Sequence, residues 1–108
     1  MTDYVQYILD LLAPFGVITS RAMFGGYGIY KDGVIVGIIA DDELYFKVDD
    51  TNKALYEKFQ SSPFTYSKGD TMAVMSYWKV PIEILEDQTS LPRWLDDSYQ
   101  ISLKKKRK

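Results

Sequence analysis

Neither cysteine nor histidine occurs among the 108 residues of this chain. Without cysteine there can be no disulfide, thiolate metal ligand or cysteine nucleophile. Without histidine the chain lacks the commonest general base near neutral pH and the commonest zinc ligand. Any catalysis would depend on Asp, Glu, Lys, Tyr, Ser or Thr, so we expect a protein that is not an enzyme and that holds no metal or cofactor.

Long hydrophobic runs are also missing. No apolar stretch approaches the roughly 18 residues of a membrane-spanning helix. The first ten residues, MTDYVQYILD, hold no Lys or Arg ahead of their apolar positions, whereas a secretory signal begins with positive charge. We therefore expect a cytoplasmic protein without membrane contact, and the length fits a single domain with a substantial core.

Positive charge is scarce in most of the chain and dense at its end. The chain has a net charge of −2, but the last five residues are all basic, so residues 1–103 carry −7. We expect one domain over 1–103 and a basic tail over 104–108, made of Lys104, Lys105, Lys106, Arg107 and Lys108. Such a tail favours nucleic-acid binding. The alternative is a solvated helix end whose cations complement the helix dipole, and an acidic body would repel a phosphate backbone.

Hydrophobic periodicity divides the first half into one helix and a meander. Thr2 can cap a helix whose apolar stripe ends at Pro14. From Val17 to Val48 the period changes to two. It predicts three antiparallel strands, over residues 23–30, 34–40 and 43–48, with turns at 32–33 and 41–42.

The second half predicts a helix, a hairpin and a last helix. Asp50 or Thr51 can cap a helix over 53–59, and residues 64–80 read as a hairpin that turns at 68–70. A short helical turn at 82–85 leads to a helix opened by Ser90. The order α-β-β-β-α-β-β-α predicts an α+β fold in which helices pack on an antiparallel sheet.

The glycines of RAMFGGYGIYKDG suggest two different structures. A phosphate-binding loop presents backbone N–H groups at a helix N-terminus, usually with Lys and Ser or Thr following. A strand and a tight turn follow Gly25, Gly26 and Gly28 instead. We expect Gly25 and Gly26 to form a bulge or sharp coil within one long strand, where positive φ or close approach of another backbone needs glycine.

Acidic pairs offer a weaker candidate for ligand binding. Asp41, Asp42 and Glu43 could grip a hard cation, but consecutive turn carboxylates diverge and no loop-like ligand spacing accompanies them. Asp49 and Asp50 suit the start of a helix. We interpret both groups as solvated turn or helix-start charges.

The strand at Val34 to Ala40 is apolar on both faces, which predicts helices on one side and a partner subunit on the other. We therefore expect a homodimer. The numerous aromatics could stack bases, but sheet lining and subunit contact suit an acidic body better. Arg21 could meet an acidic partner, although an ion pair within the fold is the simpler expectation. The candidate partner-binding residues are Arg21, Met23, Phe24, Gly25, Gly26, Tyr27, Tyr30, Tyr77 and Trp78.

Five segments carry a family resemblance. They are TSRAMFGGYGIYKDG (19–33), DDELYFKVDD (41–50), PFTYSKG (63–69), MSYWKVP (75–81) and LED (85–87). With them the chain resembles the N-terminal domain of the TfoX/Sxy family of bacterial competence regulators, over nearly the whole length before the tail.

The resemblance implies a secretion-chaperone-like fold and a cytoplasmic protein that is not an enzyme. It also implies a link to the expression of DNA-uptake genes, which the best-known members promote together with the cyclic-AMP receptor protein. Those members carry a second, helical C-terminal domain, and this sequence ends before it. Our leading hypothesis is a regulatory or protein-interaction module that uses the sheet and residues 21–30. The alternative is a nucleic-acid-associated protein that binds DNA weakly through its basic tail.

Overall fold

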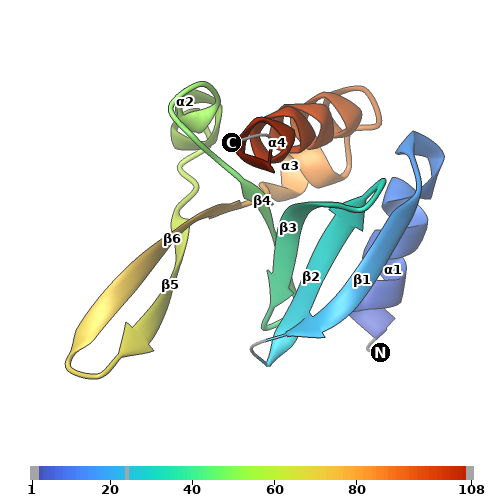
Figure 1. The fold of residues 1–108 in the computed structure, drawn as a ribbon. Coiled ribbons are helices and arrows are strands. Elements are labelled where there is room, and N and C mark those ends of the chain that lie inside the picture. Colours follow the sequence, from blue (N-terminus) through green and yellow to red (C-terminus); the bar gives the residue numbers. More distant parts are fainter. Residues whose placement is uncertain (1–2, 24, 107–108) are drawn as a thin grey trace.

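Six antiparallel strands form one sheet, with the helices gathered on one side of it (Figure 1). This computed structural model describes residues 3–23 and 25–106, except for the side chains of Lys68 and Lys106. The predicted α+β class, with helices on an antiparallel sheet, is confirmed. None of the described helices combines the length and hydrophobicity needed to cross a bilayer.

The sheet joins a meander of four strands to a separate hairpin. The spatial order is β1-β2-β3-β4-β6-β5, so the hairpin attaches through its second strand. The strands are β1 (Ile18–Met23), β2 (Gly26–Lys31), β3 (Val34–Ala40), β4 (Glu43–Lys47), β5 (Pro63–Lys68) and β6 (Thr71–Lys79). The helices are α1 (Asp3–Leu12), the 3-10 turn η1 (Ala13–Phe15), α2 (Lys53–Lys58), α3 (Ile82–Leu85) and α4 (Ser90–Lys106).

The predicted single strand over 23–30 is wrong, because the chain reverses there. β1 and β2 pair as a hairpin in which Arg21 faces Gly28 and Met23 faces Gly26. Gly25 has a φ of 76°, a left-handed conformation that glycine adopts without steric cost. The first strand has the sequence ITSRAM and is mostly exposed, so no hydrophobic alternation revealed it. The observed order therefore has one strand more than predicted.

One core lies between the helices and the covered face of the sheet. α1 contributes Val5, Ile8 and Leu12, which are fully buried. Strand residues meet them from β2, β3 and β4, and α3 and α4 complete the cluster. The core members from the sheet and from α4 include Ile29, Val36, Leu44, Phe46, Leu91, Trp94 and Leu95. Among the described residues no helix covers the opposite face, and Figure 1 shows the β5–β6 hairpin reaching away from the helices.

The predicted cap of α2 is also wrong. Asn52 occupies the N-cap position and makes no side-chain capping bond. Its amide turns back instead, because Oδ1 accepts from the Asp49 N–H at 2.9 Å and Nδ2 donates to the Lys47 carbonyl at 3.3 Å. Asp49 Oδ1 accepts from the Thr51 N–H at 2.8 Å. These bonds tie the end of β4 to the start of α2.

Among the described residues no hydrogen bond of good geometry satisfies the buried hydroxyl of Tyr56 in α2, although the Ser98 hydroxyl lies close enough to offset part of the rise that burial causes in its pKa. The neighbouring Ser98 hydroxyl donates instead to the Lys47 carbonyl at 2.8 Å. Burial raises the pKa of Tyr56 above its usual value near 10. The folded state therefore favours the neutral form of Tyr56. The contribution of this preference to the free energy of unfolding is fully present below pH 10 and decreases as the pH rises above 10.

Replacing Tyr56 by Phe should raise the free energy of unfolding at pH 7 by about 1 kcal/mol, because an unsatisfied buried hydroxyl is costly. Urea unfolding at pH 7 and above pH 10 measures both consequences. The variant should lose less stability than the wild type in alkali. Some alkaline loss should remain, because burial also raises the pKa of Tyr45 and Tyr77. A large loss of stability at pH 7 would mean that the hydroxyl has a partner.

Candidate interaction surface

A groove of about 430 Å³ lies on the sheet face opposite the helices, and none of the described residues that line it is charged. Met23 of β1, Ile35 and Ile38 of β3 and Ala40 line one part. The hairpin supplies the rest through Phe64, Tyr66, Met75 and Tyr77. Gly26, Tyr27 and Ile39 complete the lining, and we call these eleven residues the groove. It brings together side chains that are up to 54 positions apart in the sequence.

The strand pairing is irregular at two places in the sheet. The register shifts between Ile29 and Tyr30 where β2 pairs β3, and again between Pro63 and Thr65 where β5 pairs β6. Such bulges bend strands and increase their twist. Phe64, which lines the groove, meets the ring of Tyr45 on β4 edge to face, with ring centres 5.2 Å apart. The β5–β6 hairpin therefore leans over the uncovered face.

The glycine run has a structural role at one end of the groove. Gly25 and Gly26 lead into a strand, so no helix N-terminus is present there to hold a phosphate. A Cβ at Gly26 would overlap the Ile39 carbonyl oxygen, and one at Gly28 would press on the Met23 side chain. The prediction that glycine permits positive φ and close backbone approach is confirmed, although the site is a turn between two strands.

Arg21 lies beside the groove on the edge strand. Its guanidinium lies 5.9 Å from the centre of the Tyr30 ring, a cation–π distance. In the described part of the chain no carboxylate lies within ion-pair distance of it. The expected ion pair of Arg21 within the fold is therefore wrong, and its charge faces solvent.

The structure separates the predicted partner-binding residues into two groups. Met23, Gly26, Tyr27 and Tyr77 line the groove, with Tyr30 and Arg21 beside it, and Tyr27 also packs against the core. Trp78 instead packs against the helix-covered core, where its ring lies 6.4 Å from Tyr56. Phe24 lies outside the described residues, and Gly25 occupies the turn at the groove's end.

Sequence reasoning missed seven groove residues: Ile35, Ile38, Ile39, Ala40, Phe64, Tyr66 and Met75. Part of the signal was available. The apolar run of β3 showed that both faces are buried, and the alternation in β6 placed Met75 on the same side as Tyr77. Neither pattern shows that β3 and β6 approach the same groove, because β4 lies between them.

The basic tail begins inside α4. Lys104 and Lys105 are helical and exposed, whereas Arg107 and Lys108 lie outside the described residues. Partial burial lowers the pKa of Lys47, and the nearby Lys105 ammonium lowers it further. The end of β4 and the last turns of α4 thus bring three lysines near one another: Lys47, Lys104 and Lys105. Their role in nucleic-acid binding stays a prediction.

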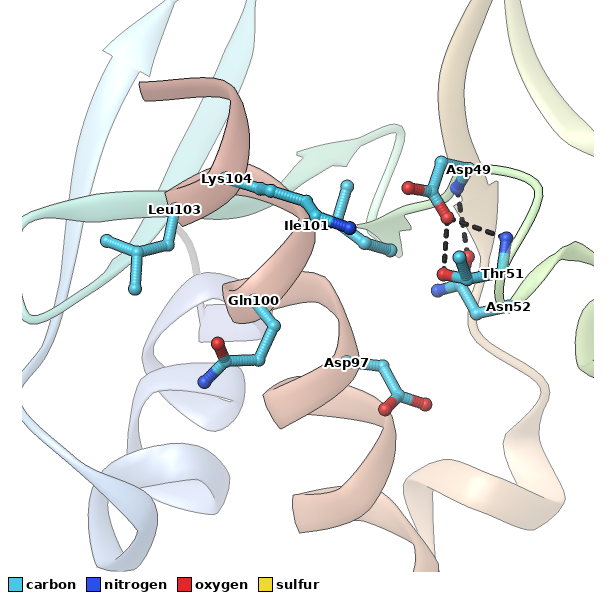
Figure 2. A pocket seen from close by; sticks show the side chains of 8 residues that line it. All are labelled: Asp49, Thr51, Asn52, Asp97, Gln100, Ile101, Leu103 and Lys104. Carbon is cyan, nitrogen blue, oxygen red and sulfur yellow. Dashed lines mark hydrogen bonds between the residues drawn. The ribbon is translucent and has the colours of Figure 1, made fainter. Parts of the chain in front are cut away.

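A second hollow, of about 410 Å³, runs along α4 beside the turn before α2. Figure 2 shows Lys104 and Asp97 directed toward the side where Asp49 and Thr51 lie, while Gln100 and Leu103 point elsewhere. The lining therefore does not converge on one point.

Thr51 and Asp49 form the pair in this hollow that most resembles a nucleophile and its base. The Thr51 hydroxyl donates to Asp49 Oδ1 at 2.5 Å. Loss of solvent around the Asp49 carboxyl would by itself raise its pKa. The hydrogen bonds from Thr51 outweigh this effect and keep the pKa of Asp49 below its usual value. A carboxylate with a lowered pKa is a poor proton acceptor near neutral pH. The uncovered groove is thus the better candidate site, and it suits binding.

Comparison with known proteins gives consistent results. The model of the family described as TfoX N-terminal domain matches residues 10–102. Protein Sxy of Escherichia coli (strain K12) is 27% identical over 97 residues, which cover 90% of this chain and 46% of that protein. DNA transformation protein TfoX1 of Aliivibrio fischeri is 24% identical over 80 residues, covering 74% of this chain and 38% of that protein. The chain thus spans less than half the length of these curated relatives.

Proposed function

Because the chain belongs to the TfoX N-terminal domain family, we propose that it is a non-catalytic regulatory module that promotes DNA uptake by binding a protein. One similar protein is named for DNA transformation, which supports this direction. Such a module acts in the cytoplasm, on the expression of the genes for uptake. The groove on the uncovered sheet face is its binding surface.

The observation that carries the proposal is the chemistry of the groove. Its lining combines aliphatic and aromatic side chains without a charge, whereas the body of the chain is acidic. Large apolar patches on a folded surface mark sites of protein contact, and aromatic and methionine side chains are enriched at the centres of interfaces. An uncharged lining holds no group that would neutralise a phosphate. A protein surface is therefore its expected ligand.

Tyr66 and Tyr7 allow a matched test of this proposal. Tyr66 lines the groove and is 42% exposed, while Tyr7 lies on α1 and is 45% exposed. Tyr66→Asp should abolish the rescue of DNA uptake in a strain that lacks the gene for this protein, because a buried unpaired carboxylate is costly at an interface. Tyr7→Asp should leave rescue intact. Transformation frequency and transcripts of the uptake genes measure the effect.

Equal rescue by both variants would refute the groove as the working surface. Failure of both variants to rescue uptake would also refute it, provided that both proteins are folded by circular dichroism and present at the wild-type level by immunoblot. A strain that takes up DNA normally without the gene would refute the regulatory role itself. Each result thus bears on a separate part of the proposal.

A further inference from the structure

We propose that the protein bound on the groove is a second copy of this chain. The two copies form a symmetric pair in which Arg21 of each meets Asp41 and Asp42 of the other. This inference rests on the proposed function, and it names the partner that the binding surface takes. It specifies the contacts of the homodimer that the sequence only suggested.

The first argument is the placement of apolar surface. Ile38 and Tyr77, at the centre of the groove, are only 9% and 8% exposed. Around them the exposed fraction rises, and Tyr66, which lines the groove from the hairpin, is 42% exposed. The groove therefore presents apolar side chains that the helices do not cover. In a two-fold symmetric dimer the same contact occurs twice, so the patch of each copy is covered by that of the other.

The second argument is the charge at the margins. Arg21 is exposed on β1, and no described carboxylate pairs with it. Asp41 and Asp42 are exposed in the turn that follows Ala40, a groove residue, and no described cation pairs with them. Arg21 lies two strands from Ile38, through the pairs Arg21–Gly28 and Gly28–Ile38, and Asp41 follows three residues beyond Ile38 along the chain. Each is thus roughly 10 Å from Ile38, in two different directions. A two-fold axis that runs parallel to the sheet over Ile38, midway between these directions, brings Arg21 of one copy near Asp41 of the other.

Two further charged groups already have contacts within each copy. Lys79 and Glu43 pair at 2.9 Å, and the Lys47 ammonium lies over the Tyr77 ring at 4.8 Å. The whole chain has a net charge of only −2, so two copies repel each other weakly.

The size of the face is sufficient. Strands about 4.8 Å apart and rising about 3.3 Å per residue give six strands of about seven residues a plane of roughly 550 Å². A standard interface takes about 800 Å² from each partner. Side-chain relief makes accessible area larger than its plane, and the projecting hairpin adds to it. The uncovered face is thus on the scale of a stable dimer interface.

A charge-swap experiment tests the pairing. Sedimentation equilibrium of the purified full chain should show a dimer. Arg21→Glu places like charges at both ends of the interface, and so does the double variant Asp41→Lys, Asp42→Lys. Each should raise the dimer Kd at least about tenfold. An equimolar mixture should recover a Kd within about threefold of the wild type, because both contacts of the mixed dimer join opposite charges.

The recovery in the mixture separates a charge effect from misfolding. Asp41 and Asp42 have φ values of 52° and 57°, a region that Asn tolerates, so Asp41→Asn, Asp42→Asn is the neutral control with an intermediate Kd. A wild type that stays monomeric at every concentration overturns the inference. A dimer that ignores both reversals, or a mixture that does not recover, overturns the proposed pairing.

Sedimentation and the DNA-uptake assay together test this inference and the proposed function separately. If the wild type is monomeric while Tyr66→Asp still abolishes DNA uptake, the groove binds another protein. The second copy is then rejected and the proposed function stands. If the wild type is monomeric and Tyr66→Asp has no effect, both are rejected. If the dimer forms as described and Tyr66→Asp has no effect on uptake, only the regulatory use of the groove is rejected.

Discussion

Replacing Gly37 by alanine should lower the free energy of unfolding by about 3 kcal/mol or more. A Cβ at this position would overlap the Tyr45 carbonyl oxygen and lie 3.0 Å from the Phe46 ring. The backbone of β3 cannot move aside, because β2 and β4 hydrogen-bond it from both edges. Since a typical domain has a total stability of about 5 to 15 kcal/mol, this change should remove a substantial part of it.

Gly69 provides the control for this result. It has a φ of 63° in the hairpin turn, and a Cβ there meets nothing within 4 Å. Gly69→Ala should therefore cost only the backbone strain, about 1 to 2 kcal/mol. Urea unfolding followed by circular dichroism measures both variants. Similar losses in the two would mean that the Tyr45 carbonyl moves aside for the new methyl group, contrary to the packing argument.

Replacing Trp94 by alanine should lower the free energy of unfolding by about 3 to 5 kcal/mol. Trp94 is 6% exposed on α4, and its ring lies 4.5 Å from that of Tyr56 and 5.7 Å from that of Phe59. It thus joins the last helix to α2, a helix of only six residues. A helix so short depends on tertiary packing for its stability, so the cavity should loosen α2 as well.

Two measurements check this second expectation. Chemical unfolding gives the loss of stability, and hydrogen exchange should show weakened protection in α2. The exposed neighbour Arg93 is the control, since Arg93→Ala should change stability by less than about 0.5 kcal/mol. If Trp94→Ala cost under about 1 kcal/mol, or if protection fell only in α4, the proposed link between the two helices would be wrong.

Local patterns predicted most of the elements because their signals lie within a few residues. Pro14 marked the end of the first helix region, and Asp32 with Gly33 marked a tight turn that the structure places between β2 and β3. Ser90 opened the last helix as expected. The extra strand escaped because β1 is an exposed edge whose polar sequence has no hydrophobic period, although its turn glycine was visible.

The candidate site was only half predictable. The segment with Arg21, Met23 and Tyr27 was recognised, and so was Tyr77, but their meeting was not. That meeting depends on β4 pairing with β6 across the α2 connection, where Phe46 faces Trp78. The same pairing sends Trp78 to the covered face while Tyr77 turns to the groove.

By itself, the sequence determined the class of fold, the family, and the absence of cysteine and histidine chemistry. The fold class and the missing chemistry follow from composition and local periodicity, and the family follows from five short segments spread along the chain. Only the tertiary structure decided which sheet face stays uncovered, where the groove lies and that Arg21 has no carboxylate partner among the described residues. The physical reason is that alternation assigns neighbouring side chains to opposite faces, whereas strand order, bulges and helix placement arise from contacts between segments far apart in the chain.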